Sequence, residues 1–137
     1  MELMEIFKEH LETARRAVID IERFQEKLAK FRADACQKSR EEQLEKWGDL
    51  TAEATFLLTF VSYAKLRLNM LDIKQLPVSA RGTQQAASKE LNDQVSTLRA
   101  VVASMTERHR GLRDLLSAET EREKRMAPVE SLSSPNG

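Results

Sequence analysis

Residues 91–116, LNDQVSTLRAVVASMTERHRGLRDLL, carry the clearest periodicity in the chain. Core positions recur at alternating steps of four and three, which is the spacing of a helix that packs against another helix along one side. One core position holds a polar residue, His109, which in a coiled coil can fix the register of the pairing. This seam consists of Leu91, Val95, Leu98, Val102, Met105, His109, Leu112 and Leu116. We predict a helix over residues 83–126, capped by Thr83 and ending before Pro128.

The preceding segment, residues 49–74, is apolar around most of its circumference. One strict seam at steps of four and three contains Leu50, Ala54, Leu57, Val61, Ala64, Leu68 and Leu71, and a second stripe beside it contains Phe56, Phe60, Tyr63 and Met70. Even the remaining polar arc is interrupted by Leu58, Leu66 and Ile73. A helix that is apolar on nearly all sides is expected to be buried on nearly all sides.

The first segment has one apolar stripe, which begins at Phe7 and fades after Ala35, and a charged face opposite to it. Because neither glycine nor proline occurs before Gly48, we predict a single helix over residues 2–47. Gly48 followed by Asp49 then predicts a helix end and a new helix start. The alternative is a break within residues 36–40, because Ser39 followed by Glu42 fits a capping box.

These segments predict an all-α fold for residues 1–126. Pro77 ends the second predicted helix, and a short connection forces the next helix to run in the opposite direction. The expected architecture is an elongated up-down-up three-helix bundle with coiled-coil-like seams. Two prolines and three serines in residues 127–137 predict a disordered C-terminal tail.

The composition of the chain excludes several classes of protein. Its 137 residues contain 22 basic and 22 acidic side chains, so nothing in the net charge favours a nucleic acid or an anionic membrane as partner. The single cysteine, Cys36, excludes a disulfide scaffold and a multi-cysteine zinc module. The longest apolar run, residues 54–64, is too short for a membrane span. We expect a cytoplasmic protein, since residues 1–5 do not resemble a secretory signal.

The chemistry-bearing residues do not form a known catalytic pattern. The chain contains neither a nucleophile with its base, nor a glycine-rich phosphate loop, nor the Glu-x-x-His pairs of a di-iron bundle. We therefore expect no enzyme activity and no cofactor. Two alternatives involve a bound ligand: haem held by Met105 and His109, or an apolar ligand beside Phe56, Phe60, Tyr63 and Met70. A third alternative is phosphotransfer through His109, which would have to face solvent.

The predicted function follows from an excess of apolar surface. Two helices of the same chain cannot cover Leu58, Leu66 and Ile73 in addition to both stripes of the middle helix, and the ends of the first and third helices should project past it. We therefore predict a non-enzymatic adaptor or assembly subunit that contacts a helical protein or a second copy of itself. The expected contact residues are the seam of residues 91–116 together with Leu58, Leu66 and Ile73.

Overall fold

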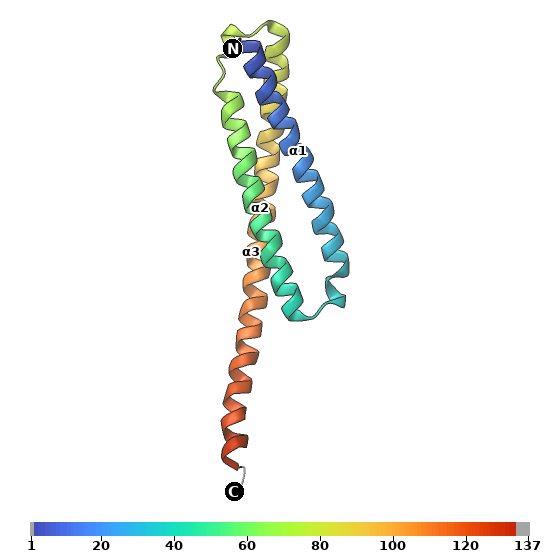
Figure 1. Cartoon of the computed structure of the whole chain (residues 1–137), viewed down its shortest axis with the longest axis vertical. Coiled ribbons are helices and arrows are strands. Elements are labelled where there is room, and N and C mark those ends of the chain that lie inside the picture. The colour runs from blue at the N-terminus through green and yellow to red at the C-terminus, as the bar shows by residue number, and fades with distance from the viewer. Residues whose placement is uncertain (1, 134–137) are drawn as a thin grey trace.

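The computed structural model describes residues 2–133 and places them in three antiparallel helices joined by short turns. Figure 1 shows an elongated molecule in which α1 (Leu3–Asp34) runs down, α2 (Arg40–Asn69) returns and α3 (Val78–Ser133) runs down again. One-turn 3₁₀ helices, η1 (Ala35–Gln37) and η2 (Ile73–Gln75), form the two connections. The predicted all-α up-down-up bundle is confirmed.

The chain breaks between α1 and α2 where the alternative prediction placed the break. Ser39 is the N-cap of α2, and its Oγ accepts a hydrogen bond from the backbone N–H of Glu42 over 3.1 Å. The Gln43 side-chain amide donates to the carbonyl oxygen of Ala35 over 2.8 Å and ties the first turn of α2 to η1. A single helix over residues 2–47 is therefore wrong, because the cap satisfies the backbone donors of a new helix start.

Gly48 and Asp49 do not separate two helices. Both lie inside α2, and no described glycine has a positive φ. Trp47, Leu50 and Ala54 flank this position on the buried face of α2. Burial of these side chains outweighs the cost of about 1 kcal/mol that glycine brings to a helix interior.

The bounds of α3 also differ from the prediction. The helix begins at Val78, five residues before Thr83, because the carbonyl oxygen of Pro77 accepts hydrogen bonds from Ala80 and Arg81, both over 3.0 Å. At its other end the backbone stays helical through Pro128 to Ser133, so the helix does not end where expected. The remaining residues of the expected disordered tail, 134–137, lie outside the described residues.

A single core follows the seams of the three helices. The α2 seam from Leu50 to Leu68 is buried against α1 and α3, as predicted, and only its last member, Leu71, is half-buried. At the corner between α1 and α2, Trp47 meets Phe31 edge to face with 4.9 Å between the ring centroids. The contacts of α2 with α3 are the most extensive and those of α1 with α3 the least.

The helices differ in length, so one of them projects. At about 1.5 Å per residue, the 56 residues of α3 span about 84 Å, whereas the 30 residues of α2 span about 45 Å. Among residues 78–126 of α3, the last fully buried side chain is Met105, and all side chains of residues 121–126 are exposed. The C-terminal end of α3 therefore extends beyond the bundle (Figure 1), whereas α1, with 32 residues, is only two residues longer than α2 and does not project past it as predicted.

Candidate partner-binding surface

The predicted seam of α3 is used mainly inside the chain. Leu91, Val95, Leu98 and Met105 are buried, and Val102 and Leu112 are half-buried against the same core. These six side chains can meet a partner fully only if the helices separate. His109 and Leu116 are half-buried where α3 leaves the bundle.

The exposed apolar side chains of α2 lie on the side of this helix that faces away from α1 and α3. Most of them are not the three residues that the sequence predicted to need a partner. Phe56 is 70% exposed, Tyr63 is 51%, Leu66 is 58% and Met70 is 71%. Of the three residues predicted to need a partner, only Leu66 is exposed, because Leu58 and Ile73 are half-buried. The prediction that the second stripe is buried is wrong for Phe56, Tyr63 and Met70, since α1 and α3 both approach α2 from its seam side.

The exposed residues of α2 form a second heptad pattern. Six exposed residues at steps of 4, 3, 4, 3 and 4, the last of them the C-cap of α2, make up what we call the outer stripe: Ala52, Phe56, Thr59, Tyr63, Leu66 and Met70. At 3.6 residues per turn, this stripe lies on the face of α2 opposite the buried seam, and its 18 residues of rise span about 27 Å. The sequence already contained this spacing, but the small Ala52 and the polar Thr59 hide it from a search for large apolar residues.

The outer stripe is free of charge, and its charged neighbours lie on one edge. Thr55, Ser62 and Asn69 follow the edge nearer α3, where the Ser88 hydroxyl donates to Asn69 over 2.7 Å. Glu53, Phe60 and Arg67 follow the other edge. Glu53 pairs with Lys27 of α1 over 2.9 Å, and the Arg67 guanidinium lies 5.5 Å from the centroid of the Tyr63 ring. A charge-free centre with charges at its rim is the usual layout of a protein interface.

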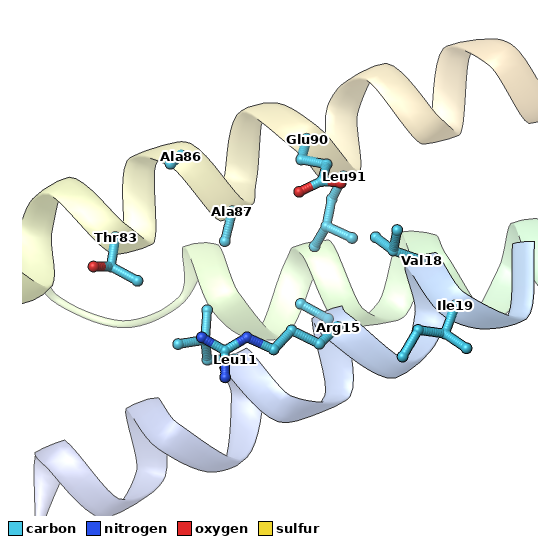
Figure 2. A pocket seen from close by; sticks show the side chains of 10 residues that line it. Leu11, Arg15, Val18, Ile19, Thr83, Ala86, Ala87, Glu90 and Leu91 are labelled. Carbon is cyan, nitrogen blue, oxygen red and sulfur yellow. The ribbon is translucent and has the colours of Figure 1, made fainter. Parts of the chain in front are cut away.

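A shallow groove between α1 and α3 is a second surface with apolar lining. Figure 2 shows Leu11 and Val18 of α1 facing Ala87 and Leu91 of α3, and the groove has a volume of about 420 Å³. The small side chains of Ala86 and Ala87 leave this space open. Arg15 and Glu90 supply the charged groups at its border.

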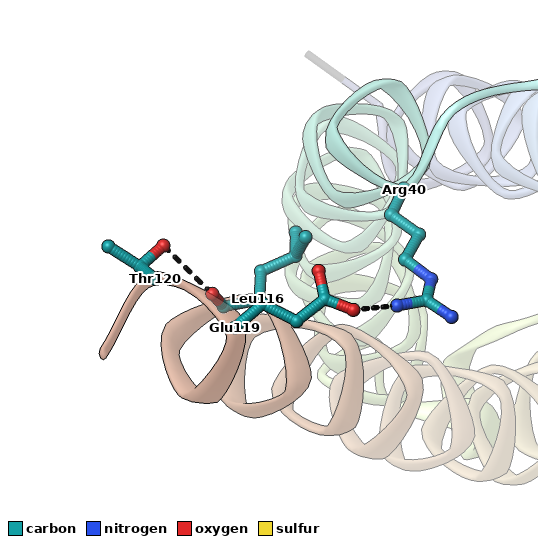
Figure 3. Close-up of polar contacts among 4 residues, drawn as sticks. All are labelled: Arg40, Leu116, Glu119 and Thr120. Carbon is teal, nitrogen blue, oxygen red and sulfur yellow. Dashed lines mark hydrogen bonds and ion pairs between the residues drawn. The ribbon is translucent and has the colours of Figure 1, made fainter. Parts of the chain in front are cut away.

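An ion pair joins α3 to the start of α2 near the end of the bundle. Figure 3 shows Arg40, at the first turn of α2, bound to Glu119, one turn beyond the half-buried Leu116. Thr120 turns back onto its own helix, where its hydroxyl donates to the Leu116 carbonyl over 3.0 Å. Both partners of the ion pair are substantially exposed, so it orients α3 rather than stabilising the fold strongly.

The residues singled out for cofactor or phosphate chemistry do not assemble a site. Met105 is fully buried, and His109 is half-buried with its Nε2 against Gly48, 3.2 Å from where a Cβ on that glycine would lie. Phe56, Tyr63 and Met70 are exposed to solvent. Within residues 2–126, whose side chains the structure describes, no three His, Cys, Asp or Glu residues are close enough together to hold a metal ion.

Among the described helices, none combines the length and apolarity that crossing a membrane requires. Searches against protein-family models, curated proteins and solved structures found no match for this chain. The outer stripe of α2 is the candidate site that its own geometry supports best.

Proposed function

We propose that this protein is a non-enzymatic adaptor or assembly subunit that binds a helical protein segment along the outer stripe of α2. The observation that carries the proposal is that this exposed stripe has coiled-coil spacing and no charge over about five turns of helix. A solvent-facing side of a helix is normally charged or polar. The stripe of α2 instead has the side chains of a helix-packing seam.

The size of the exposed area supports binding. A large side chain carries roughly 150–250 Å² of surface, so the exposed parts of Phe56, Tyr63, Leu66 and Met70 amount to about 500 Å². At about 25 cal/mol per Å², covering this area gains roughly 10 kcal/mol before the costs of association are subtracted. Those costs are of similar size, so a helical partner would bind reversibly.

A photo-crosslinking residue placed at position 56 tests the proposal in the native cell. We expect covalent adducts with a protein, which is either a second copy or another chain, through a segment with heptad-spaced apolar residues. The same probe at the exposed position 100 of α3 serves as the control. Leu66→Glu should remove the adducts formed from position 56, because a carboxylate would be buried without a partner.

The matched variant Ala100→Glu adds the same charge on an exposed helical face outside the stripe and should leave those adducts unchanged. Equal cross-linking from positions 56 and 100, or adducts that survive Leu66→Glu, would contradict the proposed function.

The groove between α1 and α3 supports one second candidate, the binding of an apolar small molecule. Its volume of about 420 Å³ lies in the range of ligand pockets, and apolar side chains form most of its lining. Ala87→Phe would fill the groove. If an apolar fluorescent probe binds to the wild type and not to this variant, the groove is the binding site; if both bind equally or neither binds, it is not.

A further inference from the structure

We infer that the helix that covers the outer stripe of α2 is α2 of a second copy, packed antiparallel about a two-fold axis. This inference rests on the proposed function, because it names the partner of the same stripe. It follows from the order of large and small side chains along the stripe. When a second copy of the stripe runs in the opposite direction, small side chains lie opposite large ones.

The sizes of the side chains match in the antiparallel arrangement. In an antiparallel pair, the numbers of two residues that face each other add up to the same value in every layer. When this value is 122, each of the six residues of the outer stripe faces another residue of the stripe. Ala52 then faces Met70 of the second copy, Phe56 faces Leu66, and Thr59 faces Tyr63. The two smallest members of the stripe thus lie opposite two of the largest, which is how well-packed layers avoid voids.

A parallel pair does not achieve this match. Each residue would lie level with its own copy, so two alanines at position 52 would be followed one turn later by two phenylalanines at position 56. A gap would alternate with a bulge along the interface. Voids and overpacking both lower the stability of packed helices.

The charges at the edge of the stripe favour the same arrangement. Glu53 and Arg67 occupy equivalent positions of the heptad, and in antiparallel pairs such positions on the two helices face each other. Glu53 of each copy would lie beside Arg67 of the other, with the two Phe60 side chains near the axis. On the opposite edge, Thr55 would meet Asn69, and Ser62 would meet Ser62. A parallel pair would place the uncharged Ser62 beside Arg67 and Gly48 beside Glu53.

The existing contacts leave this edge accessible. The Glu53 side chain is 39% exposed although it pairs with Lys27, and a carboxylate has lone pairs for a second cationic partner. Arg67 is exposed and already lies along the Tyr63 ring. The outer stripe faces away from the seam that α1 and α3 cover, so a second α2 can approach along its full length.

The buried area sets the strength of this dimer. About 500 Å² per copy, or about 1000 Å² for the pair, lies at the lower limit of specific interfaces. We therefore expect a dissociation constant on the order of micromolar rather than nanomolar. Because α3 runs antiparallel to α2, the two projecting ends of α3 would point in opposite directions from the centre of the dimer.

Sedimentation equilibrium of the full chain between about 1 and 200 µM measures the association. The wild type and Ala100→Glu should approach dimer mass, and Leu66→Glu should remain a monomer. Circular dichroism checks that all three are equally helical. A wild type that stays monomeric at about 200 µM overturns the inference. If position 56 still forms adducts with a different protein, the proposed function survives that failure, and if it forms none, both fail.

Disulfide trapping decides the orientation with mild substitutions at exposed positions. In a Cys36→Ser background, which removes the exposed native thiol, we compare chains carrying Ala52→Cys with chains carrying Met70→Cys. Antiparallel pairing brings position 52 near position 70 of the other copy, within the short Cβ distance that a disulfide requires. A mixture of the two chains should cross-link, and neither chain should cross-link with itself. Self-linking of Ala52→Cys chains without mixed products would establish a parallel pair and overturn the inference.

A charge exchange supplies an independent readout. Glu53→Arg chains and Arg67→Glu chains should each dimerise at least threefold more weakly than the wild type, because like charges face each other. Their equimolar mixture should recover wild-type association, since every pair in the mixed dimer is again opposite in charge. A mixture that associates no better than the separate variants contradicts antiparallel pairing.

Discussion

At the scale of single residues, hydrogen bonds to the first backbone N–H groups determine where the helices begin. Ser39 starts α2 because its hydroxyl accepts the Glu42 N–H, whereas the more conspicuous Gly48 sits inside the helix. Glycine can adopt the backbone conformations that end a helix, but it does not prevent a helix from continuing. The side-chain oxygen of a serine in extended conformation accepts a hydrogen bond from the N–H three residues later. This N–H has no partner within the helix, so the serine stabilises the helix start.

Ser39→Ala should lower the free energy of unfolding by about 1 kcal/mol, because the N-cap hydrogen bond is lost. Urea denaturation of the variant and the wild type measures the difference. Ser96→Ala, at an exposed position in the middle of α3, is the control and should leave stability within about 0.5 kcal/mol of the wild type. Equal effects of the two substitutions would show that Ser39 does not cap α2.

The glycines supply a second prediction at this scale. A Cβ added at Gly82 would meet nothing within 4 Å, so Gly82→Ala should raise stability by about 0.5–1 kcal/mol. A Cβ at Gly48 would lie 3.2 Å from the Nε2 of His109, so Gly48→Ala should gain less or destabilise. In a His109→Ala background, the effect of Gly48→Ala should rise to that of Gly82→Ala. A double-mutant cycle by thermal unfolding measures this coupling, and additivity would contradict it.

At the scale of elements, α2 carries two seams with the same heptad spacing, and the bundle covers only one of them. Leu68 and Leu66 are two residues apart and lie on opposite faces, the first fully buried and the second mainly exposed. Burial, rather than residue type, therefore decides the contribution of each leucine to folding. The outer seam remains available for a partner because α1 and α3 occupy the same side of α2.

Leu68→Ala should destabilise the chain by about 2–5 kcal/mol, since it opens a cavity in the core. Leu66→Ala should change stability by less than about 0.5 kcal/mol when unfolding is followed in dilute solution, where the proposed dimer dissociates. Chemical denaturation at about 0.5 µM measures both. Comparable losses for the two leucines would mean that the outer face is covered within the chain itself.

At the scale of the whole molecule, the unequal lengths of the helices leave the C-terminal end of α3 without a bundle around it. Arg40 of α2 still pairs with Glu119 of α3, and the side chains of 121–126 are exposed. A helix without tertiary contacts is marginal in water, so a partner would stabilise this end of α3. An adaptor would use such an end to reach a second protein.

Hydrogen exchange along α3 should show this difference directly. Amides near Leu91 and Leu98 should exchange slowly, with protection close to that of global unfolding, and amides of 121–133 should exchange much faster. Removal of residues 121–137 should leave the unfolding free energy within about 0.5 kcal/mol of the full chain. Strong protection beyond residue 121 in the isolated protein would contradict the prediction that this end of α3 lacks stabilising contacts.

Much of the fold could be predicted from the sequence because helix seams are periodic and local. The spacing of Leu91, Val95 and Leu98 identifies both a helix and its buried face, and Pro77 marks a turn. The helix ends were less predictable, because capping by Ser39 competes with the burial of Trp47 and Leu50 on either side of Gly48. That competition is settled by contacts with other helices.

The candidate surface required the tertiary structure. By itself, the sequence determined that the chain is helical, that it carries heptad seams, and that α2 has more apolar surface than two neighbours can bury. Which of the faces of α2 stays in solvent was decided only when α1 and α3 packed on the same side of it. Periodicity specifies which residues share a face of one helix, whereas the burial of that face depends on where the other helices lie.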